Sequence, residues 1–399
     1  MPQRRAASRT RLSGVRLALC LALAIIGGGA MAEENFFRIG TGSTGGTYFP
    51  IGGLIAGAIS NPAGSQPCDQ GGSCGVPGLI AVAQSTTGSL ANIAGIADGS
   101  LEAGLSQADI AYWAYTGTGV YSGKGRRGKR GRKKRRSAKD QPANGRIASL
   151  RAIANLYPET VHLVVRAESG INGIAGLKNK RVSLGEQGSG TLVDAKLILG
   201  AYGLSLRRVK ARYLKLGAAV DAMLAGKLDG FFVVVGAPAN AIAELARRID
   251  IRLLRIAGPK AEALIAKDPF FARGRISKDT YKGVPATTTL TVGAQLVVSA
   301  NVDETLVYGI TRALWDKNTL RLLAQGHPMG KRIRLETALT GIAIPLHPGA
   351  ARYYREIGLL PPIKPGGRDG RTDRSPTPPA ERGTRANSKG SETGPGTNF

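Results

Sequence analysis

The chain has 399 residues, and its 55 Lys and Arg outnumber its 27 Asp and Glu, which gives a formal net charge of +28. A charge this large suggests a nucleic-acid partner, but most of it lies outside the predicted folded core. Residues 1–32 supply +5, residues 123–146 supply +11 and residues 364–399 supply +3. The core that remains is only moderately basic, so the total charge does not by itself define a nucleic-acid-binding protein.

The first 32 residues are predicted to be a cleaved signal peptide. Five arginines precede the apolar run Leu17–Ile26, and Ala30-Met31-Ala32 supplies a small-x-small cleavage pattern. Ten apolar residues are too few to span a bilayer, and Leu19 stands where a lipoprotein signal would place a small residue before its cysteine. We therefore expect a mature periplasmic protein that begins near Glu33.

The first predicted strand, Phe37–Gly40, leads into a glycine-rich turn and the predicted helix Tyr48–Ile59. Gly40, Gly42 and Gly45 follow the G-x-G-x-x-G order of a dinucleotide-binding fingerprint, but the acid expected about 20 residues later is missing. A phosphate-binding P-loop is excluded because no Gly-Lys-Ser/Thr follows. The turn instead predicts backbone N–H groups that face an anion at a helix N-terminus. A tight turn without a ligand is the alternative.

Two cysteines remain after the signal peptide, in the stretch CDQGGSC. An even number of cysteines in an exported chain favours a disulfide, here Cys68–Cys74. A zinc site would need further ligands and the chain has three His, so we expect no metal. Two free thiols are the alternative.

Further along the chain, short apolar strands alternate with helical patterns, which predicts an α/β fold with parallel-type sheets flanked by helices. The other predicted strands are Leu79–Gln84, Ala103–Leu105, Val161–Arg166, Val182–Leu184, Ala211–Leu214, Gly230–Val235 and Ile251–Ile256. The other predicted helices are Leu90–Ala97, Asp109–Tyr115, Leu192–Leu199, Ala218–Leu224, Ala239–Arg247, Glu304–Trp315 and Ala350–Ile357.

A core of this length predicts two lobes. Residues 150–159 and 287–300 read as two strands that cross between the lobes and form a hinge. We expect the first part of lobe I at 33–155, with a basic low-complexity insertion at 123–146. Lobe II is expected at 156–287, the return to lobe I at 288–362 and a disordered tail at 363–399.

Three more polar turns stand between a predicted strand and a predicted helix, at residues 85–89, 186–194 and 234–240. In the third of the four turns, Thr191 and Asp194 have the spacing of a capping box. Ligands of open α/β sheets bind at the carboxyl ends of the strands. Because each lobe carries two such turns, closure is expected to bring their helix N-termini onto one small anion.

With these turns in place, the chain strongly resembles the TAXI family, the solute receptors of TRAP-type (tripartite ATP-independent periplasmic) transporters. The resemblance covers residues 36–360 and includes IGTGSTGGTYFPIGG, CGVPGLIAVAQSTTGSLANI, LRAIANLYPETVHLVVR, LKNKRVSLGEQGSGT and GIAIPLHPGAARYYREIG. It implies a type II periplasmic-binding fold with the ligand between two lobes. It also implies delivery of the ligand to a membrane permease, and relatives bind glutamate or related dicarboxylates.

The resemblance assigns a set of ligand-binding residues, drawn from the four turns and from the end of one strand. In lobe I these are Thr41, Ser43, Gly45, Gly46, Tyr48, Ser85, Thr86, Ser89 and Gln107; in lobe II they are Gln187, Ser189, Gly190, Thr191, Gly236 and Pro238. Packing at a helix start is the alternative role for Tyr48. Ala108 and Ser106, on either side of Gln107, depart from the family pattern, so the substrate is allowed to differ.

The sequence shows no catalytic set and predicts no enzyme and no cofactor. His162 is read as a core imidazole, His327 and His347 as loop residues without chemistry, and Asp221, Asp229 and Glu244 as solvated helix-edge acids. We therefore predict a monomeric receptor for a small carboxylate that works with TRAP permease subunits. The alternative is a module that binds anionic surfaces or nucleic acid through the basic run 124–136, although a solvated loop is the favoured reading of that run.

Overall fold

The computed structural model describes residues 35–70, 72–123 and 145–362. The predictions of a signal peptide, of a role for the basic run 124–136 and of a disordered tail concern residues outside these ranges. Within them, no helix is both long and apolar enough to cross a membrane.

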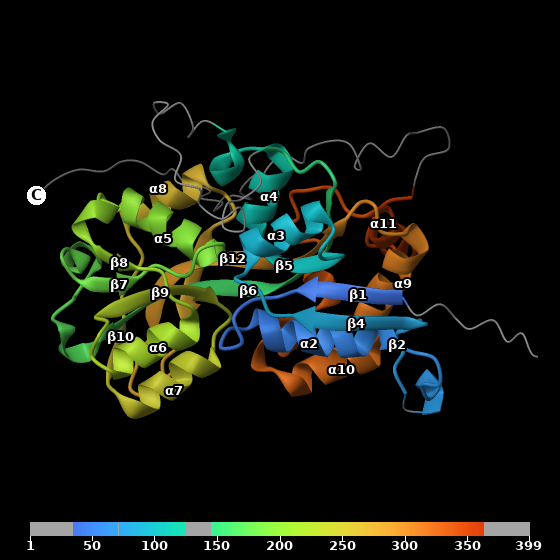
Figure 1. Ribbon diagram of the computed structural model, residues 1–399, viewed down its shortest axis with the longest axis horizontal. Helices are drawn as coiled ribbons and strands as arrows, with labels where there is room; N and C mark the ends of the chain where they lie inside the picture. The colour runs from blue at the N-terminus through green and yellow to red at the C-terminus, as the bar shows by residue number, and fades with distance from the viewer. Residues whose placement is uncertain (1–34, 71, 124–144, 363–399) are drawn as a thin grey trace, which may run out of the picture.

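Each end of the main sheet is built from parallel strands, as the βα pattern predicts. At one end, β1 (Asn35–Gly40) pairs in parallel with β4 (Leu79–Gln84) and with β5 (Ala103–Gln107). At the other end, β7 (Arg181–Ser183) pairs in parallel with β8 (Lys210–Arg212) and with β9 (Gly230–Val235). These two ends lie in separate lobes, coloured blue to teal and green to yellow in Figure 1.

Two long strands join the lobes. β6 (Leu150–Arg166) pairs antiparallel with β12 (Thr287–Ser299) from Leu150 to Thr160, and then with β9 from Thr160 to Val165. Along its main path the sheet has the strand order β4-β1-β5-β12-β6-β9-β7-β8, and two further strands pair with β6 and with β12. The predicted crossings at 150–159 and 287–300 are therefore strands, and the first continues into the predicted strand Val161–Arg166. The chain has the predicted two-lobe periplasmic-binding-protein fold with a hinge of two crossing strands.

Helices cover both faces of each lobe (Figure 1). The first lobe carries α2 (Tyr48–Ile59), α3 (Ser89–Asp98) and α4 (Ala108–Thr116), and the second carries α5 (Gly190–Ala201), α6 (Leu216–Leu224) and α7 (Asn240–Arg248). After β12 the chain returns to the first lobe with α9 (Glu304–Leu314), α10 (Lys317–Gly326) and α11 (Pro348–Glu356). The lobe boundaries at 155 and 287 stay predictions, since both long strands belong to both lobes.

Several elements were not predicted. They are β2 (Ser60–Asn61), β3 (Val76–Pro77), α8 (Pro259–Lys267), β11 (Ala272–Ile276) and α10. The observed β10 (Ile251–Leu253) is shorter than predicted. The sequence ARGRI of β11 is exposed at most positions and has no alternation of apolar and polar residues. The strand forms by pairing with β12. Secondary structure on such an edge comes from its partner strand and not from its own sequence.

Two of the hydrophobic clusters each lie mainly in one lobe. Ile39, Ile51 and Leu296 belong to a cluster under α2 and the returning helices, whereas Val182, Ile198 and Phe232 belong to a cluster under α5. All six side chains are buried. Because each lobe packs its own apolar interior, the surfaces between the lobes are free to be polar.

Cys68 and Cys74 form the predicted disulfide, with 4.7 Å between their Cα atoms. Asp229 was predicted to be a solvated acid, and this prediction is wrong. Its carboxylate accepts a hydrogen bond from the Arg181 backbone N–H at 2.7 Å and forms an ion pair with the Arg181 guanidinium. Asp229 therefore anchors the start of β7, whereas Asp221 is exposed as predicted.

Candidate functional site

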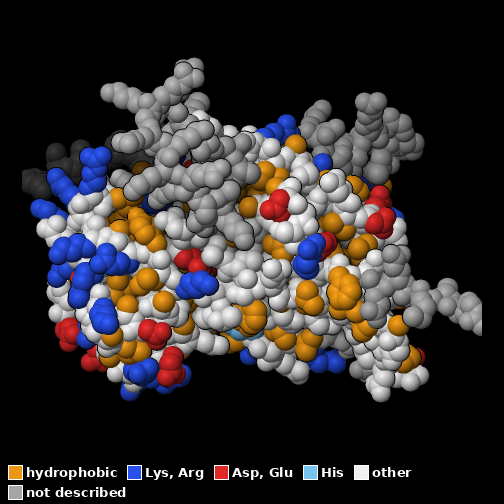
Figure 2. Space-filling view, in the orientation of Figure 1, with side chains coloured by type: hydrophobic (Ala, Val, Ile, Leu, Met, Phe, Trp, Pro, Cys, Tyr) orange, Lys and Arg blue, Asp and Glu red, His pale blue; other side chains and the backbone are white. Residues whose placement is uncertain are grey.

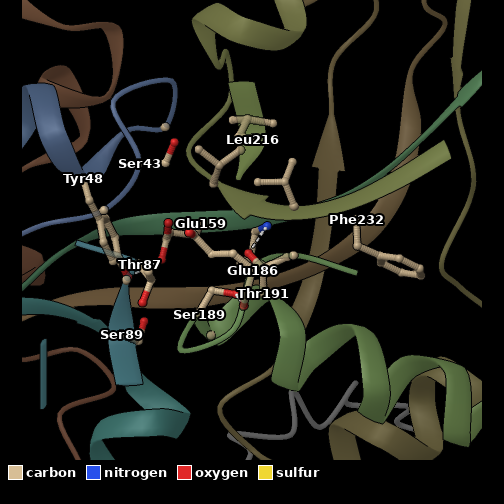
Figure 3. Close-up of a pocket in the computed structure, with 18 of the residues that line it drawn as sticks. Ser43, Tyr48, Thr87, Ser89, Glu159, Glu186, Ser189, Thr191, Leu216 and Phe232 are labelled. Carbon is tan, nitrogen blue, oxygen red and sulfur yellow. Dashed lines mark hydrogen bonds between the residues drawn. The ribbon is translucent and has the colours of Figure 1, made fainter. Parts of the chain in front are cut away.

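A small cavity lies between the lobes, with a volume of about 80 Å³. This is several times the roughly 10–15 Å³ that one water molecule needs by the same measure. It is lined by Gly42, Ser43, Gly46, Thr47, Tyr48, Thr87, Gly88, Ser89, Gln107, Glu159, Gly185, Glu186, Ser189, Gly190, Thr191, Leu214, Leu216, Ala219, Phe232, Val233, Val234 and Val235. Figure 3 shows lining side chains from both lobes, among them Tyr48 and Ser89 of the first and Ser189 and Thr191 of the second.

The loops of the two lobes touch around this cavity. The Ala91 N–H of α3 donates to the Gly188 carbonyl at 3.2 Å, and the Gly236 N–H donates to Thr47 Oγ1 at 3.1 Å. A Cβ on Gly190 would lie 1.4 Å from Gln107 Oε1. A side chain at this position would therefore have to displace the buried Gln107 amide. Because loops of both lobes touch here, the structure describes a closed arrangement.

Eight of the predicted ligand-binding residues line the cavity: Ser43, Gly46, Tyr48, Ser89, Gln107, Ser189, Gly190 and Thr191. They come from the first three turns and from the end of β5. Helices α2, α3 and α5 each begin at the cavity, and the first N–H groups of a helix have no partner within it. Ser189 is the N-cap of α5 and accepts from the Leu192 N–H at 3.2 Å.

The other predicted residues do not line the cavity: Thr41, Gly45, Ser85, Thr86, Gln187, Gly236 and Pro238. Thr41 is fully buried and donates its hydroxyl to the Gln84 carbonyl at 2.8 Å. Thr86 donates to the Thr41 carbonyl at 3.0 Å, and Ser85 donates to the Gly42 carbonyl at 2.9 Å. These hydroxyls hold the turns together, while Gly45 and Gly236 contact the opposite lobe and Gln187 is exposed.

Asn92 organises these turns and was not singled out in the sequence. Its side-chain amide donates to the carbonyls of Thr41 and Leu105, both at 2.7 Å, and it is fully buried. It lies on the buried face of α3, where an apolar residue is usual. A polar residue at such a position is the sequence signal that could have identified it. Asn92 thereby ties the ends of β1 and β5 together beneath the cavity.

Glu159 is the second residue that sequence reasoning missed. It lies on β6 where this strand passes from β12 to β9, and only 2% of its surface is exposed. Tyr48 donates its hydroxyl to Glu159 Oε2 at 2.6 Å. Burial raises the pKa of Glu159 to about 8, although the hydrogen bond from Tyr48 opposes this shift. A carboxyl group therefore stands at the hinge and lines the cavity (Figure 3).

Glu186, in the third turn, is a second carboxyl in the lining. Partial burial raises its pKa to about 7, against the opposing charge of Lys215. None of the described residues that line the cavity is Lys, Arg or His. The side-chain charge of this site is therefore acidic, in contrast to the net positive charge of the chain.

Gln107, one of the lining residues, connects the lobes. Its Nε2 donates to Asp194 Oδ2 of α5 at 2.6 Å, and its backbone N–H donates to Ser89 Oγ at 3.1 Å. Asp109 of α4 lies within hydrogen-bonding reach of Asp194, and both carboxyls are fully buried. Carboxylate oxygens only accept hydrogen bonds, so the pair is bonded only when one carboxyl carries a proton. Burial, together with the charge of Asp109, raises the pKa of Asp194 well above its usual range.

The three histidines take structural roles. His162 is fully buried, with Nδ1 at 2.8 Å from the Thr160 carbonyl and Nε2 at 2.9 Å from the Tyr281 hydroxyl, and burial lowers its pKa to about 4. His327 and His347 accept backbone N–H groups at helix starts. In the part of the chain that the structure describes, no group of three or more His, Cys, Asp or Glu side chains could hold a metal ion.

A family model, the NMT1-like family, matches residues 39–129 and 133–358. The chain belongs to the NMT1-like family. This match does not test the narrower resemblance to the TAXI family, which stays a prediction. Several solved structures are also similar to this NMT1-like chain.

Three of these structures are similar to this NMT1-like protein at low sequence identity. The alkanesulfonate-binding protein SsuA from Xanthomonas axonopodis pv. citri, bound to MOPS, is 16% identical over 82% of this chain and 94% of that chain, with a TM-score of 0.42. PhnD1 from Prochlorococcus marinus, in complex with methylphosphonate, is 11% identical over 82% and 99%, with a TM-score of 0.43. MatC from Rhodopseudomonas palustris, with bound malate, is 14% identical over 73% and 88%, with a TM-score of 0.42.

Proposed function

We propose that this protein is an extracytoplasmic solute-binding receptor that closes on a small carboxylate. The observation that carries the proposal is the cavity itself, which lies between two lobes and is lined by helix starts from both. Membership of the NMT1-like family and the two-lobe fold support the same role. Only the closed arrangement places both lobes around one ligand, so binding shifts the population towards closure.

The carboxylate would bind at the starts of α2, α3 and α5. The positive ends of these helices and the hydroxyls of Ser43, Ser89 and Thr191 replace the water around an anion. Binding with closure, rather than turnover, is the event that this geometry serves. The TAXI resemblance further suggests that the partner is a TRAP-type permease driven by an ion gradient.

Titration calorimetry with amino acids, dicarboxylates and other small carboxylates tests this proposal. Gly190→Asp would place a carboxylate against Gln107 and hold the lobes apart, so we expect it to abolish the binding heat of any ligand found. Gly200→Asp is the matched control, because Gly200 lies on the same helix and has open space around its Cβ position. The proposal is wrong if no small carboxylate binds, or if Gly190→Asp leaves the binding intact.

A further inference from the structure

Two buried carboxyl groups meet where the lobes touch, beside Gln107. Asp109 lies near the start of α4 in the first lobe, and Asp194 lies near the start of α5 in the second. Neither side chain is exposed. Gln107 donates to Asp194 Oδ2, whereas Asp194 Oδ1 and both oxygens of Asp109 have no hydrogen-bond partner among the described residues. The closed lobes therefore bury three carboxyl oxygens that lack a donor when both acids are ionised.

The other charged groups that act on this pair are acidic as well. Asp268, between α8 and β11, raises the pKa of Asp109, and Glu159 on β6 raises the pKa of Asp194. Asp268 also has a buried oxygen, Oδ2, without a partner among the described residues. Two neighbouring carboxylates cannot both stay ionised in such a place at low cost. One proton between Asp109 and Asp194 supplies the missing donor and removes the repulsion.

We propose that the lobes close by taking up a proton between Asp109 and Asp194, so that capture of a solute is coupled to uptake of a proton from solvent. This inference rests on the proposed function, because closure is the step that captures the solute, and it adds a pH-dependent condition to that step. The proton comes from solvent as the lobes close and returns to solvent as they open.

The direction of the pH effect follows from the two states. When the lobes open, the two carboxyls separate and meet water, where an Asp carboxyl is ionised above pH ~4. In the closed state, burial raises the pKa of Asp109 to about 6 and that of Asp194 well above its usual range. The closed state holds a proton that the open state lacks, so a rise in pH opens the lobes. Each pH unit over which the difference is one proton shifts the equilibrium about tenfold.

Two acids in the cavity also titrate near neutral pH, so the test compares chains that differ only at the buried pair. Burial raises the pKa of Glu159 to about 8 and that of Glu186 to about 7. Asp194→Asn and Asp109→Asn keep the shape of the side chain. In each variant the amide N–H donates to the carboxylate that remains, which replaces the proton.

A cross-link between the lobes measures closure without any solute. A Cβ on Gly45, in the first turn, would lie 3.4 Å from the Ala241 Cβ of α7. This is close to the ~3.5–4.5 Å between the Cβ atoms of a disulfide. In the double variant Gly45→Cys and Ala241→Cys, the bond forms only while the lobes are closed. Its rate of formation is measured at a fixed oxidant concentration from pH 6 to 8, with and without Asp194→Asn, and mass spectrometry identifies the bond.

The ratio of the two rates cancels the ordinary pH dependence of thiol oxidation and that of the other acids. We expect the rate with Asp194 present, relative to the rate with Asp194→Asn, to fall at least about tenfold from pH 6 to pH 8. Asp109→Asn should give the same result. Asp221→Asn, at an exposed position, is the control and should follow the unsubstituted pair. A constant ratio overturns the proposal, and so does the absence of the cross-link in every variant.

Calorimetry extends the test to capture. Succinate and L-glutamate are titrated in buffers of different ionisation enthalpy, which measures the protons taken up. If either solute binds, we expect the wild-type chain to take up about one proton more per bound solute than Asp194→Asn at pH 7. Equal uptake overturns the coupling while the solute-binding proposal stands. If no small carboxylate binds, the solute-binding proposal fails, and the cross-linking rates still decide whether closure takes up a proton.

Discussion

Gln107, Asp109 and Asp194 form a buried polar connection between the lobes. Gln107 Nε2 lies 2.6 Å from Asp194 Oδ2, while both Asp109 oxygens and Asp194 Oδ1 have no partner among the described residues when neither carboxyl is protonated. One proton placed between the two carboxyls satisfies two of these atoms. The charged groups around the pair are also acidic, namely Asp268 near Asp109 and Glu159 near Asp194. We therefore expect Asp109 and Asp194 to share one proton in the closed structure.

This pair predicts a pH dependence of stability. Burial raises the pKa of both carboxyls in the folded chain, so the folded state keeps protons that the unfolded state loses above pH ~4. The free energy of unfolding therefore falls as pH rises from there through the folded pKa, which is about 6 for Asp109 and higher for Asp194. His162 has the opposite effect, but only between its pKa of about 4 and 6.5.

Asp194→Asn tests the shared proton directly, because the Asn amide can accept from Gln107 and donate to Asp109 without an added proton. We expect it to raise the free energy of unfolding at pH 8 by about 1 kcal/mol or more, and to flatten the fall above pH 6.5. Urea unfolding across pH measures both effects, with Asp221→Asn as an exposed control. A wild-type profile that rises through this range would contradict the shared proton.

At the scale of single elements, local sequence patterns predicted the helix starts well. Tyr48–Ile59 has the predicted bounds, since a glycine turn fixes its start and Ile51, Ile55 and Ile59 bury one face. The eight lining residues that were predicted all belong to turns or strand ends of this kind. Glu159 was missed because its partner Tyr48 is 111 residues away, and no local pattern reports such a contact. The hydrogen bonds of the Thr41 and Thr86 hydroxyls to backbone carbonyls were not predicted for the same reason, since sequence shows a hydroxyl but not its partner.

Strand β8 illustrates how charge protects an exposed sheet edge. It is the last strand of the sheet, and Lys210 and Arg212 are exposed on it. Arg207 and Arg208 lie just before it, also exposed. Figure 2 shows Lys and Arg gathered on the side of the molecule where Figure 1 places β8. Charged side chains on an edge strand discourage pairing with another chain.

We expect the double change Lys210→Val and Arg212→Val to cause self-association at high protein concentration, because it leaves an uncharged edge with free backbone groups. Light scattering against concentration measures this effect. Lys227→Val removes an exposed charge from a turn and serves as the control. Strictly monomeric behaviour of the double variant would show that these side chains do not protect the edge.

At the scale of the whole molecule, the disulfide and the cavity lie in different parts of the first lobe. None of the described residues between 60 and 77 lines the cavity, and both cysteines are in a segment joined to the lobe by β2 and β3. Asn318 of α10 contacts Cys74 Sγ at 3.5 Å. Loss of the Cys68–Cys74 disulfide should therefore change the stability of the protein without changing its affinity for the ligand.

We expect replacement of both Cys68 and Cys74 by Ser to lower the free energy of unfolding by ~2 kcal/mol, because the unfolded chain regains the entropy of a short loop. Affinity for the ligand found by calorimetry should stay within experimental error. Urea unfolding and titration of the same preparation test both statements. A large loss of affinity would mean that the loop positions the first lobe's turns.

Glu159 lies on β6, one of the two strands that join the lobes, so opening of the lobes is expected to move it. If one residue both contacts the ligand and lies where the lobes are joined, a substitution there changes the affinity for the ligand and its dissociation rate together. Substitutions where β6 and β12 pair should therefore change the rate of ligand dissociation as much as the rate of association. Selection for faster delivery of the ligand would be expected to act on this position first.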